Sequence, residues 1–316
     1  MCIRDSDPFA LLESMTIAGL AVGATRGYIY LRDEYRDALR ILGTALEAAR
    51  RAGYLGDSVM GSGAAFDIEI VRGAGAYICG EETAIFNSIE GFRGEPRSKP
   101  PYPTEVGLFG MPTLVNNVET LVNVPHIVLG GGDAFAGTGT GSSTGTKLFC
   151  LSGAVARPGV YEVRFGATLR SLLDLAGGVT GTGQLQCVLL GGAAGTFVTP
   201  AHLDTELTLE GTRTIGASLG SGVVHVIDTG TALGPVLARI ADFFRHESCG
   251  QCVPCRVGTV RQHEIVVRMT NGQRRSGDLE LLRDVGAAMR DASICGLGQT
   301  AWNAIESAVD SLGALT

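Results

Sequence analysis

Four cysteines in the C-terminal part of the sequence have the spacing of ligands to an iron–sulfur cluster. Cys249, Cys252 and Cys255 are separated by two residues each, and Cys295 follows in a distant segment. A short loop with this spacing can wrap one face of a cubane cluster, and a fourth thiolate from elsewhere closes the other face. The pattern favours a [4Fe–4S] cluster and electron transfer. Structural zinc is the main alternative, although it usually takes two separated Cys-x-x-Cys pairs or mixed Cys and His ligands; chance or disulfide use is a third.

A glycine-rich segment with two adjacent acids is the second candidate for chemistry. Gly73, Gly75 and Gly80 would let a flat or phosphorylated ligand approach the backbone, and Glu81 and Glu82 would open the following helix. The same residues also suit a strand-to-helix turn with two acids placed favourably at a helix N-terminus. The residues themselves leave both interpretations open.

Two further segments carry an aromatic ring and an amide pair. Tyr102 lies in the proline-rich run 100–103, which is stiff. Asn116 and Asn117 lie at the start of a predicted apolar helix, where Asn116 could simply be a cap.

The N-terminal part of the chain has an α/β pattern. Asp7 is a plausible N-cap for a helix over 8–22, followed by a strand at 28–31, a helix at 34–52 and a strand at 67–71. Strand, helix and strand predict a parallel, right-handed crossover, with ligands expected at the carboxyl ends of the strands. The glycine-rich segment leaves the second strand at that end.

The middle of the chain predicts a small β-rich domain after a Gly/Ser/Thr-rich linker at 137–146. Its order is ββαβ, with the helix, capped by Thr168, on one face of a mixed sheet. His225 is expected to be a packed residue of the last strand, and we find no catalytic constellation here. The predicted strands are 148–151, 159–163, 187–190 and 223–227.

The chain then becomes helical to its end. Apolar stripes predict helices around 233–240, 279–289 and 302–312, with Asp278 as the cap of the second. The cysteine series falls between the first two helices, and Cys295 follows the second. A compact bundle could therefore bring the four sulfurs together.

Composition limits the class of protein. The chain has 316 residues, of which 45% are hydrophobic and 18% charged, enough for two or three domains. Its net charge of −7 gives no support for binding nucleic acid or an anionic membrane. No apolar run approaches the roughly 18 residues of a membrane span, and the N-terminus lacks the order of a signal peptide, so we expect a cytoplasmic protein. The remaining cysteines are expected to be reduced, small buried residues: Cys2, Cys79, Cys150 and Cys187.

Taken together, these motifs give the sequence a family resemblance. From Asp7 to the C-terminus it resembles the NADH-binding flavoprotein subunits (the F-type subunits) of NADH:quinone oxidoreductase and the diaphorase subunits of NAD-dependent hydrogenases and formate dehydrogenases. The endings of the cysteine motifs look closer to the soluble diaphorase branch. The resemblance rests on the segments 73–83, 115–120, 247–256 and 294–299.

The resemblance implies the fold class and the domains. It implies a partial Rossmann-like α/β domain for FMN and NADH at 1–136, a ubiquitin-like β-grasp (SLBB-type) domain at 147–228, and a helical bundle carrying a [4Fe–4S] cluster at 229–316. Family members also have a longer N-terminal segment, with a Gly-Arg-Gly-Gly-Ala-Gly-Phe loop and a following lysine that line the flavin and nucleotide pocket. This sequence contains neither, and residues 1–6 do not fit the family pattern, so we expect an N-terminally truncated chain with an unrelated leader.

The resemblance also implies roles for particular residues. Glu82 and Tyr102 would face the nicotinamide nucleotide, with the tyrosine ring stacked on adenine. Glu81 and Glu82 would order ribose, water or flavin contacts, because hydride transfer from NADH needs no general base at carbon. The residues implied near FMN are Tyr77, Glu81, Asn116, Asn117 and Thr120, and the implied cluster ligands are Cys249, Cys252, Cys255 and Cys295.

The implied activity is transfer of a hydride from NADH to FMN and of single electrons to the cluster. Implied partners are a thioredoxin-like [2Fe–2S] subunit and further iron–sulfur subunits of a larger complex, which could lie peripherally at the inner membrane. Quinone, hydrogenase, formate dehydrogenase and ferredoxin remain open as acceptors. Two other classes also stay open: a flavin-free iron–sulfur relay and a zinc-stabilised scaffold.

Overall fold

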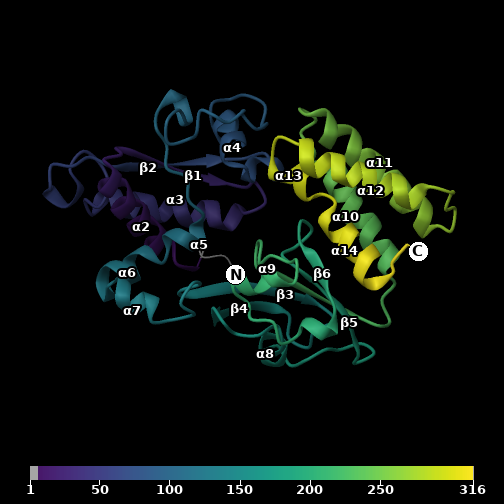
Figure 1. Cartoon of the computed structure of the whole chain (residues 1–316). Helices are drawn as coiled ribbons and strands as arrows, with labels where there is room; N and C mark the ends of the chain where they lie inside the picture. The colour runs from purple at the N-terminus through teal and green to yellow at the C-terminus, as the bar shows by residue number, and fades with distance from the viewer. Residues whose placement is uncertain (1–5, 316) are drawn as a thin grey trace. The chain divides into compact units, whose positions relative to one another are not determined.

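The computed structural model describes residues 6–315. The chain divides into two compact units, Met1–Phe135 and Ala136–Thr316. Figure 1 shows the helices and strands of each unit. Cys2 and most of the predicted leader lie outside the described residues.

The first unit is built on a parallel strand pair. β1 (Arg26–Leu31) pairs with β2 (Asp67–Arg72) in parallel, with Arg26 opposite Asp67 and Leu31 opposite Arg72. The connection between them contains α3 (Arg36–Arg51), so the predicted parallel strand–helix–strand unit is confirmed.

The helix before β1 begins where its cap predicts. Asp7 accepts a hydrogen bond from the Ala10 N–H at 3.1 Å, and Pro8 is the first helical residue. This cap satisfies one of the backbone donors that a helix N-terminus leaves unpaired. The helices of this unit are α2 (Pro8–Val22), α3, α4 (Glu82–Ile89), α5 (Val118–Leu121), α6 (Val124–Gly130) and α7 (Gly132–Ala136). Its 3₁₀ turns are η1 (Val59–Gly61), η2 (Tyr77–Gly80) and η3 (Leu108–Gly110).

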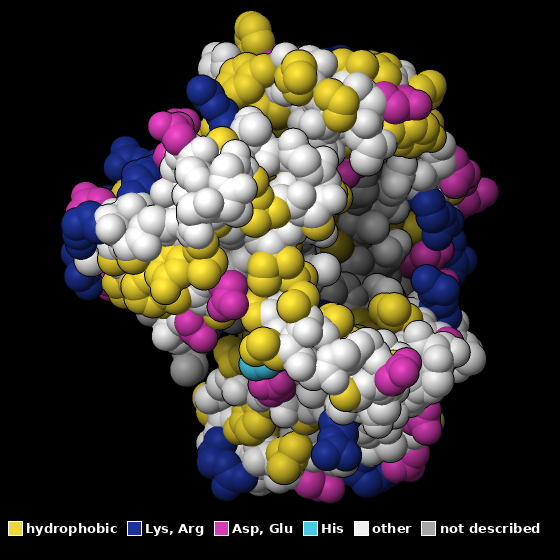
Figure 2. Space-filling view, turned by 90° about the vertical axis from the view of Figure 1, so that its left-hand side faces the viewer, with side chains coloured by type: hydrophobic (Ala, Val, Ile, Leu, Met, Phe, Trp, Pro, Cys, Tyr) yellow, Lys and Arg dark blue, Asp and Glu magenta, His cyan; other side chains and the backbone are white. Residues whose placement is uncertain are grey.

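One hydrophobic core joins these elements. Leu31 of β1, Leu42 of α3 and Ile68 of β2 are fully or almost fully buried in it, and Leu11 of α2 packs there too. Hydrophobic side chains also reach the surface, where Figure 2 shows them exposed among the charged ones. Exposed hydrophobic residues of this unit include Phe9, Val22, Val128 and Leu129.

The second unit contains a five-stranded mixed sheet in the order β4-β3-β7-β5-β6. The pair β3–β7 is parallel and the other pairs are antiparallel, so the predicted mixed sheet is confirmed. The strands are β3 (Thr146–Gly153), β4 (Gly159–Arg164), β5 (Leu185–Leu190), β6 (Thr196–Val198) and β7 (Val223–Asp228).

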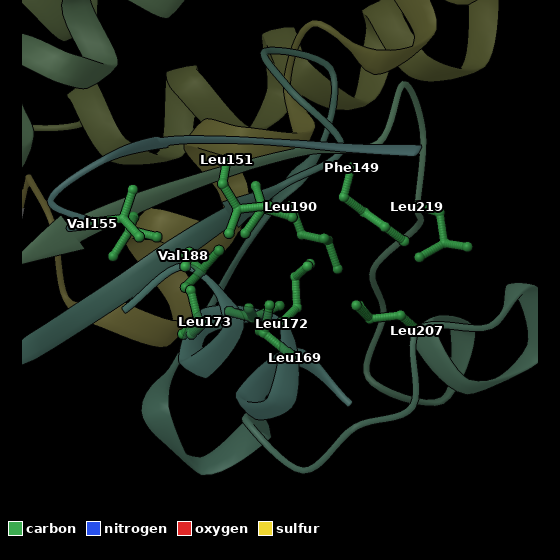
Figure 3. Close-up of a cluster of buried hydrophobic side chains, with 14 of the residues drawn as sticks. Phe149, Leu151, Val155, Leu169, Leu172, Leu173, Val188, Leu190, Leu207 and Leu219 are labelled. Atoms are coloured by element: carbon green, nitrogen blue, oxygen red, sulfur yellow. The ribbon is translucent and has the colours of Figure 1, made fainter. Parts of the chain in front are cut away.

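A short helix covers the core of this sheet. α8 (Leu169–Leu175) is capped by Thr168, whose hydroxyl accepts from the Ser171 N–H at 3.1 Å, as the sequence predicts. Figure 3 shows Leu169, Leu172 and Leu173 of α8 among the buried side chains of the sheet. The sequence did not predict β6, α9 (Leu209–Thr214) or the turn η4 (Pro200–His202).

The C-terminal helices pack as a bundle in the same unit. The bundle consists of α10 (Leu233–Glu247), α11 (Val253–Thr270), α12 (Asp278–Ala292), α13 (Gly296–Thr300) and α14 (Asn303–Leu312). Trp302, Phe244, Leu282 and Met289 fill its interior. It joins the sheet through α14, because Ser307 Oγ accepts from the N–H of Phe197 in the edge strand β6 at 2.9 Å.

Three local predictions are wrong. Asp278 is not the cap of α12: Gly277 takes that position, and the Asp278 carboxylate binds Arg268 and accepts from the Arg275 N–H at 2.8 Å. Cys150 is exposed rather than buried, because it alternates with inward-facing Phe149 on β3. The cysteine series is not one loop, because its last member lies in the first turn of α11, a helix that the sequence did not predict.

The predictions for His225, Cys79 and Cys187 are confirmed. His225 is partly buried in β7, and its Nδ1 lies 2.9 Å from Ser152 Oγ. Burial lowers the pKa of this imidazole. Cys79 and Cys187 are free and buried, and burial raises the pKa of the Cys187 thiol to about 12. Among residues 6–315, no helix is both long and apolar enough to span a membrane.

Candidate functional site

Three of the four candidate cluster cysteines lie at helix beginnings of the bundle, and the fourth lies after the end of a helix. Cys249 follows α10, Cys252 is the N-cap residue of α11, Cys255 lies in its first turn, and Cys295 is the N-cap residue of α13. None of the four is in a disulfide. A helix N-terminus carries partial positive charge, which suits a thiolate.

The bundle brings the four thiols close enough to influence one another. Burial, with a smaller contribution from Cys249, Cys252 and Cys295, raises the pKa of the Cys255 thiol to about 11. Burial also raises the pKa of Cys295, against hydrogen bonds from the backbone N–H groups of Leu297 and Gly298.

This arrangement fits a [4Fe–4S] cluster. A cubane offers a separate iron to each cysteine, so its ligands need not converge on one point, as they do around a single ion. Among the described residues, no group of three or more His, Cys, Asp or Glu is arranged to hold a single metal ion. The amides directed at Cys295 would stabilise a ligating thiolate. They belong to Leu297 and Gly298, at the start of α13.

The glycine-rich segment begins where β2 ends. A side chain at Gly73 would place its Cβ 2.5 Å from the phenol oxygen of Tyr30, so only glycine fits beneath this ring. Gly75 has a φ of 88°, in the left-handed region that favours glycine. A Cβ at Gly80 would meet no protein atom within 4 Å.

Glu81 caps helix α4. Its Oε2 accepts from the N–H groups of Thr83 at 2.9 Å and Ala84 at 2.8 Å. Burial would raise the pKa of this carboxyl, but the hydrogen bonds, including one from Lys99, hold it below its ordinary value. The helix-terminus interpretation of this acid is therefore confirmed, and it leaves open a ligand role for its partner Glu82.

Lys99 joins the two glutamates. Its Nζ lies 3.0 Å from Glu81 Oε1 and also donates to Glu82 Oε1. Burial would lower the pKa of this amine, but the two carboxylates raise it. The sequence analysis missed this residue, although it is one of only two lysines in the chain.

Arg97 fixes the backbone that carries Lys99. Its Nε donates to Asn87 Oδ1 at 2.8 Å, and its guanidinium pairs with Glu90 and lies over the Phe86 ring, 5.7 Å from its centroid. The segment before the proline run is thereby attached to α4.

The other predicted ligand residues are accessible. Tyr77 is 40% exposed and Tyr102 is 55% exposed. Asn116, Asn117 and Thr120 are exposed, just before and within α5. Asn117 rather than Asn116 takes the N-cap position, without a side-chain cap, so the capping interpretation of Asn116 is wrong.

The hydrophobic core of the first unit connects the two predicted ligand segments, which are the glycine-rich segment after β2 and the start of α5. Val118 and Leu121 of α5 pack against the same core as Ile70 of β2, the strand that leads into the glycine-rich segment.

Known families match along the chain. The Nuo51 FMN-binding domain matches residues 2–126, the SLBB domain residues 148–193, and the NADH-ubiquinone oxidoreductase-F iron-sulfur binding region residues 235–313. The first match begins at residue 2, so the expectation that residues 1–6 lie outside the family pattern is wrong for residues 2–6. An NADH-quinone oxidoreductase F-type subunit of Rhizobium meliloti is 41% identical over 308 residues, which cover 97% of this chain and 73% of the relative.

The chain belongs to the family of NADH-quinone oxidoreductase F-type subunits. The predicted family and fold class are thus confirmed. NADP-reducing hydrogenase subunit HndC of Solidesulfovibrio fructosivorans is 42% identical over 310 residues, which cover 98% of this chain and 63% of that one. The crystal structure of NAD+-reducing [NiFe]-hydrogenase in the H2-reduced state superposes with a TM-score of 0.90 and 37% identity, over 99% of this chain and 52% of that one. This member of the F-type family thus spans just under two thirds of HndC and about half of the hydrogenase chain.

Proposed function

We propose that this chain is the NADH-oxidising flavoprotein subunit of an electron-transfer complex. A hydride passes from NADH to FMN, and single electrons pass to a [4Fe–4S] cluster and on to partner subunits. The observation that carries the proposal is that one bundle holds four cysteines outside disulfides, three of them at helix beginnings, in a chain of the F-type family. FMN, when bound, accepts two electrons together and releases them singly, which suits a one-electron cluster.

We assign the cofactors to two of three regions of the chain. Residues 1–136 bind FMN and NADH, residues 147–228 form the SLBB-type domain, and residues 229–316 hold the cluster. The cluster ligands in this proposal are Cys249, Cys252, Cys255 and Cys295.

The flavin site in this proposal lies where β2 ends. Backbone at Gly73, Gly75 and Gly80 approaches the flavin, and the open space at Gly80 supports that role. The side chains assigned to FMN are Tyr77, Glu81, Asn116, Asn117 and Thr120.

The nucleotide site uses the exposed side of the same region. Glu82 orders the nucleotide ribose or its water, and the accessible ring of Tyr102 stacks on adenine. Glu81 has a positioning role rather than an acid–base role, because its two carboxylate oxygens already hold the start of α4 and Lys99. Lys99 keeps the two acids together.

The partners follow from the need to pass electrons on. The relatives carry the names of quinone oxidoreductase and hydrogenase subunits, so the proposed partners are a thioredoxin-like [2Fe–2S] subunit and further iron–sulfur subunits of a cytoplasmic or membrane-peripheral complex. The subunits bound determine the final acceptor.

Cofactor analysis of the chain purified without oxygen tests the proposal. Iron, acid-labile sulfide, zinc and FMN are measured per chain, with visible spectra before and after NADH. We expect about four iron and four sulfide with FMN that bleaches on NADH. Iron and sulfide without flavin would favour a relay, and zinc alone would contradict electron transfer.

A further inference from the structure

Ser248, at the end of α10, lies beside the thiol of Cys255. Its Oγ is 3.2 Å from Cys255 Sγ and accepts from the Gly250 N–H at 3.3 Å. Because the amide occupies one side of the oxygen, the hydroxyl hydrogen is free to point at the sulfur. A sulfur bound to iron is a thiolate without a hydrogen, so in that state the serine must be the donor.

The peptide at Gly250 is itself held in place. Gly250 has a φ of 79°, and its carbonyl accepts from Arg256 Nη1 at 2.9 Å. Arg256 thereby fixes the amide that orients Ser248. The chain of contacts runs from Arg256 through Gly250 and Ser248 to Cys255.

A second hydroxyl approaches Cys255 from the segment before α13. Ser293 is 6% exposed, and within the described part of the chain its Oγ has no hydrogen-bond partner. A Cβ on Gly298 would lie 2.3 Å from Ser293 Oγ and 2.9 Å from Cys255 Cβ, so both residues border the same small space. A buried hydroxyl without a partner calls for an explanation, and a cluster sulfur would be a suitable acceptor.

We propose that Ser248 and Ser293 donate hydrogen bonds to the Cys255 side of the cluster and raise its reduction potential. The inference rests on the cluster of the proposed function and adds two residues that tune it. Hydrogen bonds to cluster sulfurs stabilise the reduced state, because that state carries the greater negative charge. Loss of either hydroxyl should therefore make the cluster harder to reduce.

The test is a redox titration of the full chain, loaded without oxygen with ferrous iron and sulfide and followed by electron paramagnetic resonance. We expect a lower midpoint potential in Ser248→Ala and in Ser293→Ala, and a potential near that of the unsubstituted chain in Ser248→Thr, which keeps a hydroxyl. Ser276→Ala is the matched control. Ser276 is exposed after the far end of α11, a helix about 27 Å long.

Two results would overturn the inference. One is a full complement of iron and sulfide with an unchanged midpoint in both alanine variants, and the other is a shift in Ser248→Thr as large as in Ser248→Ala. If Ser248→Ala does not hold the cluster, the midpoint potential of Ser293→Ala and the Fe–S stretching frequencies of Ser248→Thr decide instead. A lower midpoint in Ser293→Ala, with frequencies in Ser248→Thr like those of the unsubstituted chain, supports the inference. An unchanged midpoint in Ser293→Ala, with shifted frequencies in Ser248→Thr, overturns it. An unsubstituted chain without iron and sulfide would instead overturn the proposed function, and this inference with it.

Discussion

At the scale of single residues, two glycines of the same glycine-rich segment have different structural roles. Gly73 lies under the Tyr30 phenol, whose oxygen is also 2.9 Å from Ser88 Oγ. Gly80, seven residues later, has open space where a side chain would lie. The first glycine is required by the fold, whereas the second leaves room for a ligand.

We therefore predict that Gly73→Ala destabilises the chain by about 1–3 kcal/mol, the usual cost of overpacking, because Tyr30 must move. Gly80→Ala, the matched control, should leave the free energy of unfolding almost unchanged while weakening FMN binding. Urea unfolding and FMN titration of both variants measure the two effects. Equal stability losses in the two variants would contradict this distinction.

The sequence predicted the roles of some residues of the candidate sites and missed the contacts of others. The series of Cys249, Cys252 and Cys255 and the Glu81 cap depend on local spacing, which a sequence displays directly. Lys99 lies more than fifteen residues after Glu81 and Glu82 in the sequence, so no local pattern predicts its contacts with them. The contact between Tyr30 and Gly73 likewise joins residues that are far apart in the sequence, so a local pattern does not predict it either.

At the scale of elements, long periodic helices and strands were predicted and short or unusual ones were not. α3 has a clear apolar stripe, and the strands before and after it in the sequence, β1 and β2, carry isoleucines or leucine at alternate positions. α11 buries Gly258, Thr259 and Gln262 beside its apolar residues, so it has no simple stripe despite its 18 residues. β6 has three residues and α13 five, too few for periodicity to appear.

An ion pair connects α11 to the start of α12. Asp278 is buried, and its carboxylate binds the Arg268 guanidinium; with the Arg275 N–H, this lowers the pKa of Asp278 from 3.8 to about 2. Since the folded-state pKa is depressed, the stabilisation is complete above the unfolded-state pKa. It is lost as the pH falls from about 4 toward 2.

We predict that Asp278→Asn lowers the urea midpoint of the second unit at pH 7, because Arg268 then loses its carboxylate partner. The difference from the unsubstituted chain should shrink as the pH falls toward 2. Asp284→Asn, at an exposed position of the same helix, should have little effect. A difference independent of pH would show that the charge of Asp278 is not the cause.

At the scale of the whole chain, the two units carry different natural probes. The single tryptophan, Trp302, is 1% exposed in the bundle. Six of the seven tyrosines precede residue 136, and only Tyr161 lies in the second unit. Tryptophan fluorescence therefore reports on the cluster-bearing unit, and tyrosine signals report mainly on the other.

We predict that removing iron with a chelator lowers the thermal midpoint seen by Trp302 fluorescence, since a metal centre bound only by the folded bundle stabilises it. Each kcal/mol lost should lower that midpoint by about 2–4 °C for a unit of this size. The midpoint seen by tyrosine circular dichroism should move less. A chelator that shifts both signals equally would contradict separate stabilisation of the bundle.

The scarcity of lysine has a practical consequence for chemical labelling. Lys99 and Lys147 are the only side-chain amines of the chain, against 23 arginines. An amine-specific reagent followed by peptide mass spectrometry would therefore report the environment of the two glutamates at α4 with almost no background. Protection of Lys99 by added NADH, with Lys147 as the internal reference, would measure occupancy of this region in an unmutated protein.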